Sequence, residues 1–132
     1  MAPGDGAVPM SGHVAPVLHL ADIALPEGRG DYGSGAVQRL GPANVFAALV
    51  EFGSESVGTA MFSGRGWPRL RARDLHAQAM QRPIDRMAGV QQFFVVEGRA
   101  FCLYCVVGSS VRRGVLVDRL NAALAGVRIE PR

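Results

Sequence analysis

Residues 91–107 (QQFFVVEGRAFCLYCVV) limit what this chain can fold into more than any other part of its sequence. The stretch is rich in aromatic and β-branched side chains, which favour strands, and Glu97-Gly98-Arg99 interrupts it once. Both halves are apolar on their two alternating faces, as is typical of strands buried on both sides. The sequence therefore predicts a β-hairpin at the centre of a sheet.

Three other stretches also predict strands. Residues 14–25 indicate an opening strand that Pro26 ends, and residues 44–52 and 57–62 indicate a hairpin with a four-residue connection. Between them, the glycine-rich residues 27–35 predict an exposed loop, and residues 36–40 fit a short strand or one helical turn.

Two helices are expected in the second half of the chain. Asp74 is a suitable N-cap for a short helix over residues 75–81, which Pro83 would end. Ser109 or Ser110 would cap a longer helix that runs to about residue 125. Five apolar side chains share one face of that helix, whereas Asp118 and Asn121 lie away from it: Leu116, Leu120, Ala123, Leu124 and Val127.

These elements predict an α+β fold with a single domain. Hairpins separated by helices favour a mainly antiparallel sheet of hairpins, with a short middle helix and a C-terminal helix packed on it. We expect residues 1–13 to be a flexible leader and residues 14–132 to form the domain. A chain of 132 residues is long enough to bury a core without disulfides.

The sequence predicts a soluble cytoplasmic protein. Two cysteines are too few for a disulfide framework, and prolines at 3, 9 and 16 would break a signal helix. The longest apolar stretch, residues 100–107, is far shorter than the ~20 residues of a membrane-spanning helix. We therefore expect no membrane insertion.

Every cation in the chain is arginine, and the arginines are unevenly placed. Residues 1–62 carry a net charge of −4 and residues 63–132 a net charge of +7. GC-rich codon usage alone would replace lysine by arginine, so the bias in composition has a non-functional explanation as well as a functional one. The functional explanation is a surface for phosphate, nucleic acid or an acidic partner.

The candidate binding residues form one dense cluster: Arg65, Trp67, Arg69, Arg71 and Arg73. Guanidinium and indole groups both stack on bases, and guanidinium pairs with phosphate or carboxylate. The alternative is a solvated loop that Trp67 anchors to the core. Four other arginines are candidates for the same surface: Arg82, Arg86, Arg112 and Arg113.

A glycine pattern suggests a further alternative, a nucleotide-dependent enzyme. Gly28, Gly30 and Gly33 follow a predicted strand with the spacing of a dinucleotide-binding loop, and Glu51 stands about 20 residues further on. However, only residues 34–40 remain for the phosphate-binding helix, and a parallel crossover needs a dozen residues or more.

No catalytic, metal-binding or cofactor-binding set is predicted elsewhere. Cys102 and Cys105 match a C-x-x-C pattern, but an extended strand sends side chains three positions apart to opposite faces, so we expect two buried structural thiols. His13, His19 and His76 are far apart in sequence, and His19 fits a satisfied core or edge residue.

Two stretches resemble the Mog/PsbP-like group of small α+β proteins: residues 23–28 (IALPEG) and residues 117–129 (VDRLNAALAGVRI). The resemblance implies a sheet packed against a late helix and a binding or accessory role without catalysis. It carries over no functional residue.

The sequence thus favours a small non-enzymatic interaction module over an enzyme. Its expected partner is another protein or a second copy of itself, since exposed strand edges allow a homodimer. Binding of an anion or nucleic acid through the arginine cluster is the alternative.

Overall fold

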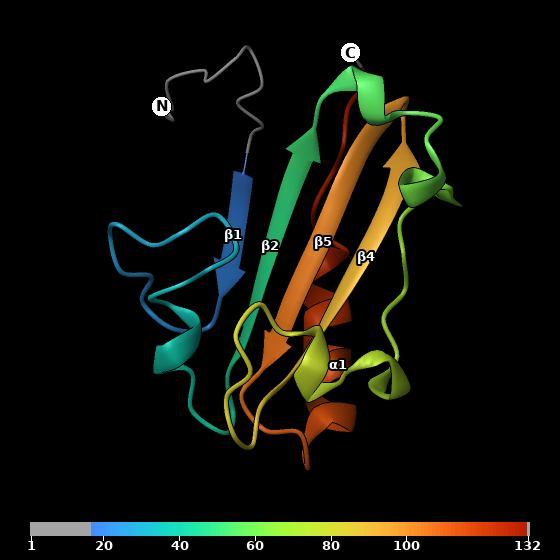
Figure 1. Ribbon diagram of the computed structural model, residues 1–132. Coiled ribbons are helices and arrows are strands. Elements are labelled where there is room, and N and C mark those ends of the chain that lie inside the picture. Colours follow the sequence, from blue (N-terminus) through green and yellow to red (C-terminus); the bar gives the residue numbers. More distant parts are fainter. Residues whose placement is uncertain (1–16, 132) are drawn as a thin grey trace.

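The computed structural model describes residues 17–131, which form one five-stranded sheet with a single α-helix against it (Figure 1). The strand order across the sheet is β1-β2-β5-β4-β3. The bounds are β1 Val17–Ala21, β2 Val45–Phe52, β3 Gly64–Arg65, β4 Ala88–Val96, β5 Arg99–Val107 and α1 Arg113–Leu124.

The α+β prediction is confirmed, and the sheet is mainly antiparallel as expected. β2 pairs antiparallel with β1 and β5, and β5 pairs antiparallel with β4. Only the two-residue β3 is parallel to its neighbour, β4. The predicted leader, the first residues of the predicted opening strand and His13 lie outside the described residues.

The predicted central hairpin is also confirmed, because β5 occupies the middle of the sheet with β4 beside it. Its turn consists of Glu97 and Gly98, whose φ angles are +53° and +71°. Positive φ at both central residues is the signature of the tight turn that matches the twist of paired strands, and Gly98 adopts it without steric cost.

The predicted hairpin of residues 44–52 and 57–62 is wrong in its second half. The first half is β2, but β2 pairs with β1 and β5, which leaves no edge for another strand. Residues 54–62 instead contain two 3₁₀ turns, Ser54–Ser56 and Ala60–Phe62, and only Phe62 of them is buried. Because β2 is apolar on both faces, it is better placed inside the sheet than at its edge.

The predicted middle helix is likewise wrong. Two 3₁₀ turns, Ala72–Asp74 and Ala77–Ala79, stand in its place. His76 between them exchanges two backbone hydrogen bonds with Gly89 of β4, both 2.9 Å long, so the backbone there is extended. Leu75 and Met80 then enter the cores on opposite faces of the sheet, which one short helix could not achieve.

The predicted C-terminal helix is confirmed, although it begins a few residues later than expected. The Ser109 hydroxyl accepts a hydrogen bond from the Arg112 backbone N–H (3.3 Å) just before α1. Leu116, Leu120 and Leu124 are buried as expected. Three assignments differ from the prediction: Ala123 is exposed, Val127 lies beyond the end of α1 and is half-buried, and the buried face includes Val117.

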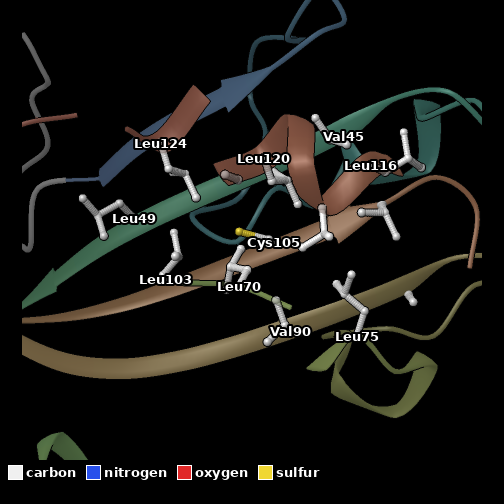
Figure 2. Close-up of a cluster of buried hydrophobic side chains, with 14 of the residues drawn as sticks. Val45, Leu49, Leu70, Leu75, Val90, Leu103, Cys105, Leu116, Leu120 and Leu124 are labelled. Carbon is white, nitrogen blue, oxygen red and sulfur yellow. The ribbon is translucent and has the colours of Figure 1, made fainter. Parts of the chain in front are cut away.

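The core on the α1 side of the sheet is almost entirely aliphatic (Figure 2). Side chains from α1 meet alternate residues of β2, β5 and β4, and Leu70 and Leu75 close the β4 side. The labelled members include Val45, Leu49, Val90, Leu103, Cys105, Leu116, Leu120 and Leu124. Burial of each such side chain contributes about 1.5–3 kcal/mol, so this layer fixes the position of α1.

Loops rather than a helix cover the opposite face of the sheet. Alternate residues of β2 and β5, such as Phe46 and Tyr104, pack there against the β1–β2 connection and the segment before β4. The buried members are Ala36, Val37, Leu40, Phe46, Ala48, Met80, Met87, Tyr104 and Val106. The fold therefore has a central sheet, a helical layer and a layer of irregular loops.

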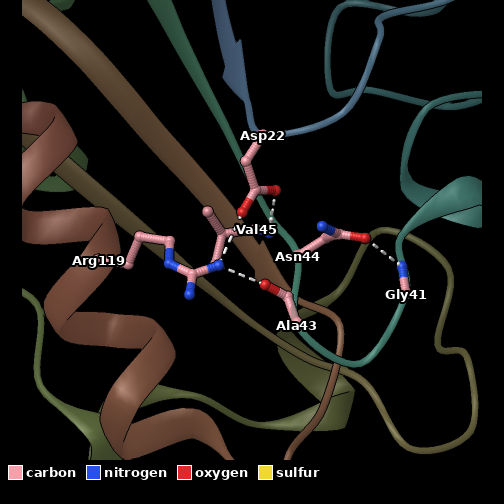
Figure 3. Close-up of polar contacts among 6 residues, drawn as sticks. All are labelled: Asp22, Gly41, Ala43, Asn44, Val45 and Arg119. Atoms are coloured by element: carbon pink, nitrogen blue, oxygen red, sulfur yellow. Dashed lines mark hydrogen bonds and ion pairs between the residues drawn. The ribbon is translucent and has the colours of Figure 1, made fainter.

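An ion pair ties α1 to the end of β1 (Figure 3). Arg119 donates to the carboxylate of Asp22 (2.9 Å) and to the carbonyl oxygen of Ala43, and Asp22 also accepts the backbone N–H of Val45 (2.9 Å). The strand β1 ends at Ala21, directly before Asp22 makes these contacts, and not at Pro26 as the sequence predicted.

A second, more buried ion pair joins β2 to β5. Both carboxylate oxygens of Glu51 accept hydrogen bonds from Arg99, at 2.7 and 2.8 Å, and Arg99 also donates to the Glu130 carbonyl oxygen (2.7 Å). Glu51 is 2% exposed, and Arg99 gives its buried carboxylate a partner of opposite charge.

Within residues 17–131, no helix has the length and apolar character needed to cross a bilayer.

Candidate functional site

The predicted arginine cluster begins at the open edge of β4. Gly64 and Arg65 form β3 beside Phe94 and Val95, and the Gly66 N–H donates to the Val95 carbonyl oxygen (2.9 Å). The chain then leaves this edge and runs along the α1 side of the sheet as far as the turn at residues 72–74. We call residues 65–73 the arginine segment.

Three contacts fix the backbone of the arginine segment. The Trp67 ring meets the Phe94 ring edge to face, with centroids 5.3 Å apart. Leu70 is buried, and the side-chain amide of Asn121 on α1 accepts its N–H (3.1 Å) and donates to its carbonyl oxygen (2.8 Å). An amide that satisfies both backbone groups of one residue acts like a strand partner, so the segment is held at its middle.

The arginines alternate with the anchoring residues. Arg69, Arg71 and Arg73 are exposed, whereas Leu70 is buried and Ala72 half-buried. Arg71 is extended (φ −125°, ψ 152°), so its side chain points away from that of Leu70, and Arg73 lies in the 3₁₀ turn that follows. The structure therefore places these guanidinium groups on the solvent side of an anchored backbone.

None of the four guanidinium groups of the arginine segment has an ion pair or hydrogen bond with another residue in the range 17–131. The one carboxylate that follows closely, Asp74, accepts the backbone N–H of Arg71 (3.0 Å). The positive charge of the segment is thus not neutralised by the part of the fold that the structure describes.

Two of the other four candidate arginines, Arg82 and Arg86, lie on the opposite side of the sheet from this segment. Arg82 lines a cleft on the opposite side of the sheet, and Arg86 donates to the Leu40 carbonyl oxygen (3.4 Å) in that layer. Arg112 comes directly before α1, and Arg113 donates to the Ser110 carbonyl and hydroxyl oxygens at 2.8 and 3.2 Å.

The glycine pattern lacks the structural context that a dinucleotide site requires. Gly28, Gly30 and Gly33 lie in the connection between the antiparallel strands β1 and β2, not between a strand and a long helix. A single 3₁₀ turn, Val37–Arg39, follows them. Glu51 is paired with Arg99, so it is not presented to this loop as a ribose ligand.

Cys102 and Cys105 lie on opposite faces of β5, as predicted. Cys105 belongs to the core beneath α1, whereas Cys102 interacts with Tyr32 on the other side. Burial raises the pKa of the Cys102 thiol to about 11 and raises that of Cys105 further. Two separated, protonated thiols cannot form a redox pair.

His19 has hydrogen-bond partners on both ring nitrogens, which fits the predicted edge residue. Its Nε2 donates to the Asp31 carbonyl oxygen (2.7 Å), and its Nδ1 accepts from Arg29 Nε (2.7 Å). Burial lowers the pKa of His19, in agreement with a neutral ring in that arrangement. Among the described residues, no three His, Cys, Asp or Glu side chains gather in a way that would hold a metal ion.

Sequence reasoning missed the role of Asn121. The helical pattern placed it away from the buried face of the helix, yet it is half-buried and holds Leu70. Its position gave one indication, because Asn121 directly follows the buried Leu120 and its amide can therefore reach a segment that lies beside the helix. Its partner, fifty-one residues earlier in the chain, could not be found from local pattern.

Comparison with known proteins does not indicate a function for these residues. No known protein family, curated protein or solved structure matches the chain.

Proposed function

We propose that this protein is a non-enzymatic binding module whose arginine segment binds an acidic stretch of another protein. The observation that carries the proposal is the exposure of Arg65, Arg69, Arg71 and Arg73 on a backbone fixed by Trp67 and by the Leu70–Asn121 hydrogen bonds.

The anchored backbone supports binding because it lowers the entropic cost of association. A loop that is already ordered loses little conformational freedom when a partner binds. Arginine adds a planar fork of N–H donors that matches a carboxylate with two parallel hydrogen bonds. A row of acidic side chains would therefore find preformed partners on the segment.

A protein partner fits the aromatic side chain better than a nucleic acid does. Single-stranded nucleic acid binds basic grooves in which aromatic rings stand free to stack on bases. Trp67 is half-buried, and its ring already packs against Phe94. No second aromatic residue occurs in the arginine segment.

The other sequence predictions remain part of this proposal. A cytoplasmic location suits the two free buried thiols. The resemblance to the Mog/PsbP-like group implies an accessory role of the same kind, and pairing through a strand edge would add a homodimer.

The test compares an acidic peptide with nucleic acid by fluorescence anisotropy. A labelled poly-glutamate peptide, a single-stranded oligonucleotide and a duplex of similar charge are titrated with the wild-type protein and with the double variant Arg69→Gln, Arg71→Gln. We expect peptide binding that weakens with salt and weakens about tenfold or more in the double variant. The matched control is Arg39→Gln, Arg128→Gln, which removes the same charge from exposed positions outside the segment.

Equal weakening in the control variant would mean that net charge alone drives binding, and the proposal would be wrong. Tighter binding of either nucleic acid than of the peptide would replace the protein partner by a nucleic acid. A pull-down from the native host with and without nuclease would then identify the partner.

A further inference from the structure

The layer of loops opposite α1 contains a cleft that the proposed function does not use. Its volume is about 480 Å³, within the range of small-molecule sites. The glycine-rich loop forms one wall and Gln81-Arg82 the other, with Tyr104 of β5 also lining it. The lining residues are Gly30, Asp31, Tyr32, Ser34, Val37, Gln38, Gln81, Arg82 and Tyr104.

The wall made by the glycine-rich loop is already ordered. The backbone of Gly30 accepts the N–H of Gly33 (2.9 Å) and donates to the carbonyl oxygen of Ser34 (3.0 Å). Gly33 has a φ of +84°, and a Cβ there would come within 2.4 Å of the Phe46 ring, so this loop sits directly on the core. His19 holds the adjacent carbonyl of Asp31.

The Tyr104 hydroxyl has a hydrogen to donate and no acceptor for it among residues 17–131. Tyr104 is 1% exposed, and its oxygen accepts the backbone N–H of Gln81 (2.8 Å). Buried hydroxyl groups almost always donate as well as accept. A ligand oxygen in the cleft would supply the missing acceptor.

Opposite charges stand on the two walls of the cleft. Arg82 and Asp31 are both exposed, and neither side chain has an ion pair or hydrogen bond within the described part of the chain, including with the other. The Gln38 side-chain oxygen accepts the Gly35 N–H (2.6 Å), which leaves its amide hydrogens available as donors. The cleft thus offers a cationic group, an anionic group and neutral donors.

We infer that this cleft binds a small zwitterion, a free amino acid. The carboxylate of the ligand would bind Arg82 and accept the Tyr104 hydroxyl hydrogen, and its ammonium group would bind the Asp31 carboxylate. The Tyr32 ring, which meets Tyr104 edge to face with centroids 5.7 Å apart, gives the wall an apolar surface for a side chain.

The first experiment measures the melting temperature of the full chain with each of the standard free amino acids at millimolar concentration. A ligand that binds the folded state raises the melting temperature by mass action. Calorimetric titration then compares the best amino acid with its decarboxylated amine and its deaminated acid. We expect the zwitterion to bind about tenfold or more tightly than either analogue.

Variants locate the binding in the cleft. Arg82→Gln and Asp31→Asn are expected to weaken affinity about tenfold or more, while the control variants Arg39→Gln and Asp85→Asn leave it unchanged. Tyr104→Phe keeps the ring and removes only the hydroxyl, and circular dichroism checks that each variant is folded.

The inference is overturned if no amino acid changes the melting temperature or gives binding heat. It is also overturned if the deaminated acid binds as tightly as the zwitterion, or if Arg82→Gln and Asp31→Asn bind like the wild type. None of these results bears on the poly-glutamate titration, because that surface lies on the α1 side of the sheet.

Discussion

Protonation of His19 should affect the stability of the fold. Burial lowers its pKa below the ordinary value of 6.5, and the neighbouring guanidinium of Arg29 acts in the same direction, while its contacts with Asp31 oppose the shift. The unfolded chain therefore takes up a proton at a higher pH than the folded chain does. Stability from this residue is present above the unfolded pKa and is lost as the pH falls.

We predict that the free energy of unfolding of the wild type decreases between about pH 7.5 and 5.5, and that His19→Gln removes part of this dependence. Urea denaturation across this range measures it. His76→Gln, which changes an exposed side chain, is the control and should keep the wild-type slope. An unchanged slope in His19→Gln would show that other groups cause the dependence.

The two cysteines give a second prediction at this scale. With a pKa of about 11 for Cys102 and a higher one for Cys105, only about one thiol in a thousand is a thiolate at pH 8. The folded protein should therefore leave an aromatic disulfide reagent unreacted, and both thiols should react after unfolding in guanidinium chloride. Rapid reaction of one thiol in the folded protein would contradict the burial of that side chain.

Among the elements, the arginine segment depends on α1 for its position. Asn121 holds both backbone groups of Leu70, and an unpaired buried N–H or C=O group costs about 1–3 kcal/mol. These two hydrogen bonds are the polar link between the segment and the helix.

We predict that Asn121→Ala lowers the free energy of unfolding by about 2 kcal/mol, as measured by urea denaturation. It should also weaken poly-glutamate binding, although it removes no charge, because the arginines would no longer be held in place. Asp118→Ala, at an exposed position on the same helix, is the control and should change neither stability nor binding by a comparable amount.

The elements that were predicted correctly are those whose patterns are local. The β4–β5 hairpin combines strand residues with a turn that needs Gly98, and α1 repeats leucines at helical spacing. The two errors, the strand at 57–62 and the helix at 75–81, both come from pairing between distant residues. β2 pairs with β1 and β5 instead of with residues 57–62, and His76 pairs with Gly89 at the sheet edge instead of lying in a helix. In both cases the pairing partners lie far away in the sequence, so the local pattern does not reveal them.

The candidate site was predicted only in part, for the same reason. Its residues were found from their density in the sequence, and their exposure agrees with a binding surface. Arg82 and Arg86, two further candidates for the same surface, lie on the opposite side of the sheet, because the chain crosses the β4 edge at His76. The glycine pattern suggested a nucleotide site, whereas the cleft beside this loop also needs Gln81 and Tyr104, which are far away in sequence.

At the scale of the whole molecule, the sheet separates two surfaces of different chemistry. The α1 side carries the arginine segment, and the loop side carries the amino-acid cleft. Sites without shared partners act independently. We predict that Arg69→Gln, Arg71→Gln leaves amino-acid binding unchanged and that Arg82→Gln leaves the poly-glutamate affinity unchanged, with calorimetry and anisotropy as the measurements. A cross-effect would mean that the sheet couples its two faces.

The central place of β5 in the sheet also determines how the chain can be made. β5 joins β2 to β4, yet it is the last strand in the sequence. During synthesis from the N-terminus, β2 has β1 on one side and no partner on the other until residues 99–107 have left the ribosome. The sheet therefore closes late, and a nascent chain that stalls before β5 exposes the apolar edge of β2 to other chains.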